Sequence, residues 1–155
     1  MNVLFVCDDC SLALMAESIL ATLGDGRFRA HSAGYAPART ANRIVLDFLA
    51  RHHMRIDGLA AKGLERFRTA PAPRMDFIIT LADVGAELFA DWPGAPFIAH
   101  WNVRDASDDL RDEATLRDAF WTLMRRIKIF ASLPQGSLNR RVLERRALTL
   151  EASYL

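Results

Sequence analysis

Apolar residues follow two kinds of spacing along this chain. Apolar runs or strict alternation predict strands at residues 2–6, 27–31, 76–81 and 96–100. Apolar residues recurring every three or four positions predict four helices. The first runs from Ser11 to the glycine at 24, and the second is capped by Thr40 and runs past Leu49. A short helix follows over 83–89, and a long one carries 116–127 and ends before Pro134. Strands that alternate with helices predict an α/β fold: a three-layer sandwich in which a four-stranded parallel sheet has helices on both faces.

The chain has the size of one globular domain with an appended tail. Its 155 residues are 51% hydrophobic, which is enough to bury a single core. We predict one domain over residues 1–132 and a C-terminal basic amphipathic extension over 133–155. In the extension Arg140, Arg141, Arg145 and Arg146 stand beside apolar residues. This pattern favours a helix that packs on the domain or on a partner, a second copy of the chain included.

Charge and hydropathy exclude several classes of partner. The formal net charge is +1, so no global field attracts nucleic acid or an anionic membrane. No apolar run approaches the ~20 residues of a membrane span, and the apolar start is too short for a signal peptide. We therefore predict a soluble, cytoplasmic protein that binds neither nucleic acid nor membrane and needs no cofactor.

Candidate chemistry gathers on the turn between the first strand and the first helix, in the stretch VLFVCDDCSLAL. Parallel sheets carry their sites at the carboxyl ends of strands, and Cys7 lies at such an end. A helix N-terminus offers unpaired N–H groups and a positive dipole end, which bind an anion and stabilise a thiolate. Cys7 is therefore a candidate nucleophile. The alternative is that Cys7 is a small buried residue at a strand end.

Six short motifs, in order along the chain, resemble those of the low-molecular-weight protein tyrosine phosphatases and the thioredoxin-coupled arsenate reductases that share their fold. They are VLFVC at 3–7, MAE at 15–17, SAG at 32–34, TLAD at 80–83, PG at 93–94 and HWNVRD at 100–105. The resemblance implies Cys7 as nucleophile in a phosphate-binding loop and Asp105 as general acid. It also implies hydrolase or arsenate reductase chemistry on a phosphate- or arsenate-like anion, with a thiol-redox partner in the reductase case.

The loop departs from the family pattern in length and charge. The family has an arginine six residues after the cysteine and three before the methionine of MAE. These two counts reach Ala13 and Leu12 here, so the loop is one residue short and the arginine is missing in either register. An arginine that donates hydrogen bonds to two oxygens of a phosphate or arsenate is the strongest single contact to such an anion. Asp8 and Asp9 would repel a dianion and raise the pKa of Cys7. We therefore include residues Asp8, Asp9, Cys10, Ser11, Leu12 and Ala13 in the candidate oxyanion loop but expect weakened anion chemistry.

The second redox cysteine of the reductases is also missing. Its position in the TLAD stretch is Ala82, so a second thiol would have to come from Cys10. Asp105 is retained, but Ala106 follows it where the family commonly has proline.

Cys10 supports a third interpretation. The spacing Cys7-x-x-Cys10 at a helix N-terminus is typical of a dithiol redox pair. The two sulfurs could instead hold a soft divalent metal together with Asp8, Asp9 or a histidine, although no further ligand motif completes such a set. Three interpretations therefore stay open: a divergent family member with weak or lost oxyanion chemistry, an active enzyme using Cys7 and Asp105, and a thiol-redox or metal-binding module.

Overall fold

The computed structural model describes residues 1–82, 85–103 and 110–134. The predicted C-terminal extension from residue 135 onward, the aspartate of the TLAD stretch and the candidate acid Asp105 lie outside the described residues. Within the described part of the chain, no helix is both long and apolar enough to cross a membrane.

The sheet has four parallel strands, as predicted. Their order is β2 (Arg29–Gly34), β1 (Asn2–Cys7), β3 (Phe77–Thr80) and β4 (Phe97–His100). The carboxyl ends of β1 and β2 meet where Cys7 lies opposite Gly34 in the register. The strand that carries the candidate nucleophile is therefore an inner strand, buried along its length.

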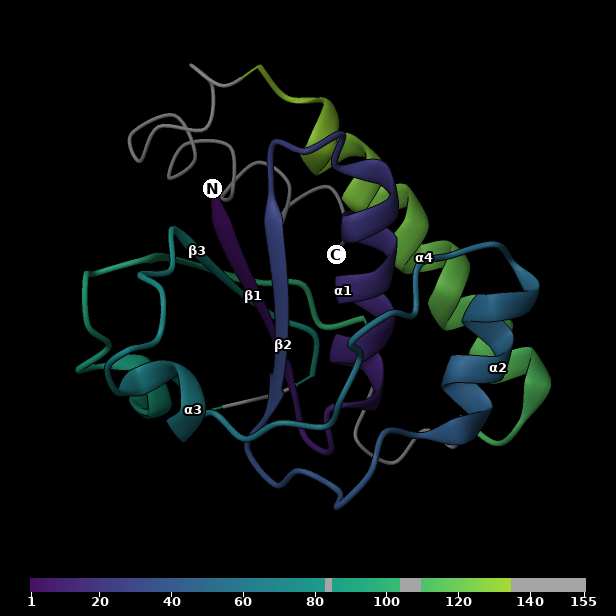
Figure 1. Cartoon of the computed structure of the whole chain (residues 1–155), viewed down its shortest axis with the longest axis horizontal. Helices are drawn as coiled ribbons and strands as arrows, with labels where there is room; N and C mark the ends of the chain where they lie inside the picture. Colours follow the sequence, from purple (N-terminus) through teal and green to yellow (C-terminus); the bar gives the residue numbers. More distant parts are fainter. Residues whose placement is uncertain (83–84, 104–109, 135–155) are drawn as a thin grey trace.

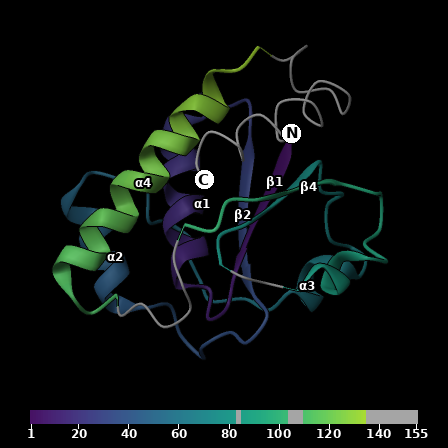
Figure 2. The ribbon, with the colours of Figure 1, turned by 180° about the vertical axis from the view of Figure 1, so that it is seen from behind.

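Helices cover both faces of this sheet. The helices α1 (Ser11–Leu23), α2 (Arg43–Arg51) and α4 (Glu113–Ser132) lie on one face, as Figures 1 and 2 show from opposite sides. The short helix α3 (Glu65–Arg68) and the 3₁₀ helix η1 (Ala86–Phe89) belong to the other face. The three-layer architecture is confirmed.

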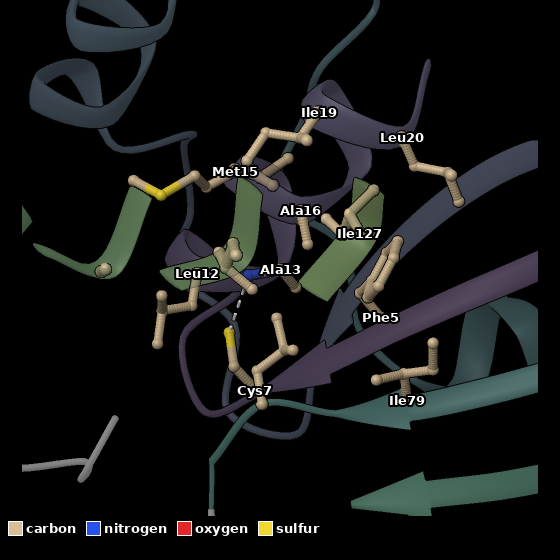
Figure 3. Close-up of a cluster of buried hydrophobic side chains, with 14 of the residues drawn as sticks. Phe5, Cys7, Leu12, Ala13, Met15, Ala16, Ile19, Leu20, Ile79 and Ile127 are labelled. Atoms are coloured by element: carbon tan, nitrogen blue, oxygen red, sulfur yellow. Dashed lines mark hydrogen bonds between the residues drawn. The ribbon is translucent and has the colours of Figure 1, made fainter. Parts of the chain in front are cut away.

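Alternate residues of β1 build two separate cores. Phe5 faces the α1 and α4 side, where Ile127 packs beside it in the larger core (Figure 3). Phe120 belongs to the same core. Leu4 and Val6 face the α3 side and its smaller core. Because side chains alternate across a strand, an apolar run without polar interruption is what burial on both faces requires.

Several predicted boundaries were wrong. The second strand is Arg29–Gly34, so it begins two residues later than predicted and extends through the SAG motif. The N-cap of α2 is Asn42 rather than Thr40: its side-chain oxygen accepts the Ile44 N–H at 3.0 Å. The expected helix over 83–89 is a 3₁₀ turn at Ala86–Phe89 within the described residues. The four-residue α3 was not predicted.

Candidate active site

A three-residue turn joins β1 to α1 and forms the centre of the Cys7 loop, by which we mean residues 7–13. Cys10 is the N-cap of α1 and has a φ of 79°, in the left-handed region. A residue with a Cβ in this region stores strain, on the order of 1–3 kcal/mol, and such strain clusters at functional sites. The chain therefore turns sharply at Cys10, directly before the first turn of α1.

The amides at the start of α1 are already hydrogen-bonded within the loop. The Ala13 N–H donates to the Cys7 sulfur across 3.4 Å, drawn as the dashed line in Figure 3. The Ser11 N–H donates to a carboxylate oxygen of Asp9 across 2.9 Å. A carboxylate is an anion, so the helix N-terminus binds the loop's own negative group where another anion could bind.

The environment of Cys7 disfavours its thiolate. The side chain has no exposed surface, and this burial raises the pKa of the Cys7 thiol far above its usual range. The Ala13 N–H acts in the opposite direction, whereas the neighbouring Cys10, Asp9 and Asp8 raise the pKa further. Cys7 is therefore a protonated thiol at neutral pH.

Cys10 is buried in a different environment. Burial raises its pKa, whereas the Lys62 backbone N–H, the Ser32 hydroxyl and the Lys62 charge lower it. Glu17 opposes them through its own charge. Both cysteines are free thiols.

Behind the loop lies a mostly buried polar cluster formed by Glu17, Ser32 and Lys62. The Ser32 hydroxyl donates to a carboxylate oxygen of Glu17 at 2.9 Å, and the Lys62 ammonium lies 3.5 Å from the same oxygen. Glu17 and Ser32 belong to the MAE and SAG motifs, but we did not predict that they meet. Lys62 was missed entirely, because nothing around it in the sequence marks it as buried.

The end of β2 holds the loop through backbone contacts. The Tyr35 N–H donates to the Cys7 carbonyl at 3.2 Å, and the Ala36 N–H donates to the Asp8 carbonyl at 2.8 Å. Gly34 packs so closely that a Cβ there would lie 2.6 Å from the Asp8 carbonyl oxygen. The SAG motif therefore ends in glycine because the loop backbone takes the place of a side chain.

The metal-binding interpretation is only partly matched by the geometry. The Cys7 sulfur and carboxylate oxygens of Asp8 and Asp9 all lie within 4.8 Å of one another. Among the described residues, this group includes neither Cys10 nor any of the histidines His31, His52, His53 and His100. A metal would therefore have one sulfur ligand rather than the two expected.

A match to a known protein family agrees with the arrangement of strand, turn and helix around Cys7. A family model described as low molecular weight phosphotyrosine protein phosphatase matches residues 2–96. The chain belongs to this family. A search of curated proteins by sequence gave no match.

Solved structures share the fold of this phosphatase-family chain. An arsenate reductase in its phosphate-binding state superposes with a TM-score of 0.69 at 23% identity, covering 84% of this chain and 96% of that one. The arsenate reductase of Archaeoglobus fulgidus gives 0.67 at 20%, covering 84% and 99%. The YwlE arginine phosphatase, in a variant with a phosphorylated active-site serine, gives 0.66 at 16%, covering 92% and 99%.

Three positions show how this family member departs from the family's site. Leu12 and Ala13, where the two counts place the arginine, both lie in the first turn of α1 and are buried, Leu12 with 6% exposure. Ala82, in place of the second redox cysteine, is buried in the larger core. The structure thus brings Cys7 and the first turn of α1 together as predicted. The loop has no arginine, and position 82 has no redox cysteine.

Proposed function

We propose that this chain is a divergent member of its family in which oxyanion hydrolysis is weak or lost. The observation that carries the proposal is a hydrogen bond at the start of α1: the Asp9 carboxylate accepts the Ser11 N–H at 2.9 Å. A phosphate or arsenate would have to displace Asp9 from its amide before it could bind there.

The charges in the loop support the same conclusion. Asp8 and Asp9 oppose both a bound dianion and a thiolate at Cys7, and the arginine that would offset them is missing. Loss of one preorganised donor to a developing oxyanion costs roughly 10²–10³ in rate. The family's chemistry would here have to use a protonated nucleophile. No arginine would neutralise the negative charge of the transition state.

The Ala13 amide favours an active enzyme as the alternative. Its N–H points at the Cys7 sulfur, as a thiolate nucleophile needs. In this alternative Cys7 attacks a phosphate- or arsenate-like anion, Asp105 acts as general acid, and arsenate reduction would use Cys10 and an external thiol partner.

Steady-state hydrolysis of an aryl phosphate separates these two functions. The wild type is compared with its Cys7→Ser variant, and arsenate-dependent oxidation of a thiol donor is followed in parallel. We expect slow turnover or none by the wild type in either assay, so the two proteins should differ little. Rapid turnover that disappears in Cys7→Ser would refute weak or lost oxyanion chemistry and show an active enzyme.

The cluster of Cys7, Asp8 and Asp9 favours a metal-binding role as a second candidate. Zinc accepts sulfur and oxygen ligands, and three protein ligands leave a position open. Titration with cobalt(II), which gives a sulfur charge-transfer absorbance when a thiolate binds, tests this function. The Cys7→Ser variant is the control, and absorbance that persists in the variant would exclude a site at Cys7.

The thiol-redox function makes its own prediction. Mild oxidation followed by alkylation and mass measurement should show Cys7 joined to Cys10 within one chain. Two alkylated thiols per chain after oxidation would contradict it.

A further inference from the structure

The strand β2 forms an edge of the sheet and has β1 as its only strand neighbour within the described structure. The N–H groups of Arg29 and Tyr35 point toward β1, where they donate to carbonyls of Met1 at 2.8 Å and Cys7 at 3.2 Å. Backbone groups alternate in direction along a strand. The even-numbered residues of β2 therefore present their N–H and C=O groups to the opposite side, away from the sheet.

The chain itself pairs with this outer side at one end only. The Gly34 N–H donates to the Lys62 carbonyl at 2.8 Å, in an isolated parallel bridge between Gly34 and residue 63. The Ser32 N–H acts on the Glu17 carboxylate and lowers its pKa. The N–H and C=O of Ala30 have no backbone partner in the described part of the chain. The first half of β2 is thus an open edge, next to a position that already forms an isolated parallel bridge.

A cavity of about 520 Å³ lies along this open edge. Ala30 and Lys62 line it from the β2 side, and Arg66, Phe67, Pro71 and Pro73 line it from the opposite side. In Figure 1, β2 is the foremost strand and α3 lies to its left. Proline has no N–H, so the wall formed by these two prolines offers fewer donors to close the edge. The space is left for an extended segment from elsewhere.

The charges around the cavity select an acidic occupant. Lys62 and the exposed Arg66 line it, while Glu17 is its one carboxylate among the described residues and is paired with Lys62 at 3.5 Å. The pKa of His31, which also lines the cavity, is lowered by burial and by the charges of Lys62 and Arg29. The described lining residues therefore carry one positive charge in excess, that of Arg66. The chain's own C-terminal segment, with its four arginines at 140–146, has the wrong charge for this site.

We propose that the outer edge of β2 binds an extended acidic peptide of a partner protein. The peptide adds a strand beside Ala30, hydrogen-bonds to its free N–H and C=O, and places a carboxylate against Arg66. Main-chain pairing supplies affinity in this mode of recognition, and pockets for alternate side chains supply specificity. This binding site shares Lys62 and Glu17 with the polar cluster next to Cys10, but it does not depend on oxyanion chemistry.

The charge part of the proposal is tested by fluorescence anisotropy. The probe is a labelled peptide of alternating glutamate and valine, and the reference is the same peptide with lysine in place of glutamate. We expect saturable binding of the acidic peptide only, weakened at least about ten-fold by Arg66→Glu. The control Arg43→Glu reverses an exposed charge on α2 and should leave the affinity unchanged. Absence of saturable binding, or equal weakening by both variants, would overturn the proposal.

The main-chain part is tested at Ala30. The variant Ala30→Pro removes an N–H that points away from β1, so it should abolish peptide binding with little loss of stability. Amide hydrogen exchange on the wild type gives a readout that does not depend on this variant's folding. The Ala30 amide should exchange more slowly when the peptide is bound. Unchanged exchange at Ala30 under saturating peptide would show that no strand is added.

Discussion

Replacing Gly34 by alanine tests whether the end of β2 holds the Cys7 loop by close backbone contact. A Cβ at Gly34 would lie 2.6 Å from the Asp8 carbonyl oxygen and 2.8 Å from the Cys10 nitrogen. Both atoms are backbone, so neither can swing away as the end of a flexible side chain would. The loop or the strand must shift to admit the methyl group.

The size of the effect follows from two opposing terms. Forcing an extra methyl group into a packed site costs about 1–3 kcal/mol. Alanine in place of glycine recovers about 0.4–1 kcal/mol, because the unfolded chain loses conformational freedom. We expect Gly34→Ala to lower the free energy of unfolding by about 1–2 kcal/mol.

The matched control is Gly63→Ala, at the other residue of the same bridge. A Cβ at Gly63 would meet only a side-chain carbon of Pro37, at an ordinary contact distance of 3.5 Å. This variant gains the entropic term without the clash, so the two variants should differ by about 2 kcal/mol. For a chain of this size that corresponds to about 4–8 °C in melting temperature. Urea unfolding of both variants would refute the reasoning if their stabilities agree within about 0.5 kcal/mol.

Three further predictions concern the buried groups. Cys7 should react with iodoacetamide at pH 7 far more slowly than a free thiol, as peptide mapping can show, because it is buried and protonated; fast labelling would contradict this. Phe120→Ala should cost about 3–5 kcal/mol in urea unfolding, since its ring is 1% exposed in the larger core; a loss below about 1 kcal/mol would contradict that packing. The folded-state pKa of His31 is lowered from its ordinary value of 6.5, so the unfolded chain binds more protons and stability falls as the pH drops below about 6.5. His31→Gln should reduce that fall between pH 7.5 and 5, and an unchanged pH profile would count against it.

The fold was predictable because burial leaves a clear pattern in the sequence. Residues of β1 and β3 are buried on both faces, so their apolar runs have no polar interruption. The second strand was harder to delimit, because Ser32 and Gly34 do not resemble strand residues. They are small for reasons outside the strand: one hydrogen-bonds Glu17, and the other lies against the loop backbone.

The site was predictable in position but not in its internal contacts. The strand, turn and helix pattern placed Cys7 at a helix N-terminus, and the two residue counts showed that the family's arginine is missing in either register. The role of Asp9 could have been read from its spacing, since an aspartate commonly accepts the backbone N–H two residues later. The pairing of Glu17 with Lys62 could not have been read from the sequence, because 45 positions separate the two residues and only the sheet topology brings them together.

The hydrogen bonds that hold the loop and those that would bind an anion come from different groups. Backbone N–H groups of Tyr35 and Ala36 fix the loop from outside, so its shape does not require a bound anion. We expect anion affinity to depend instead on the side chains at positions 9 and 12. Leu12→Arg alone would bury a charge, because this position is 6% exposed, and would leave Asp9 on its amide. Recovery of phosphate binding therefore requires one inserted residue in the loop, an arginine at position 12 and a neutral residue at position 9, all in the same variant.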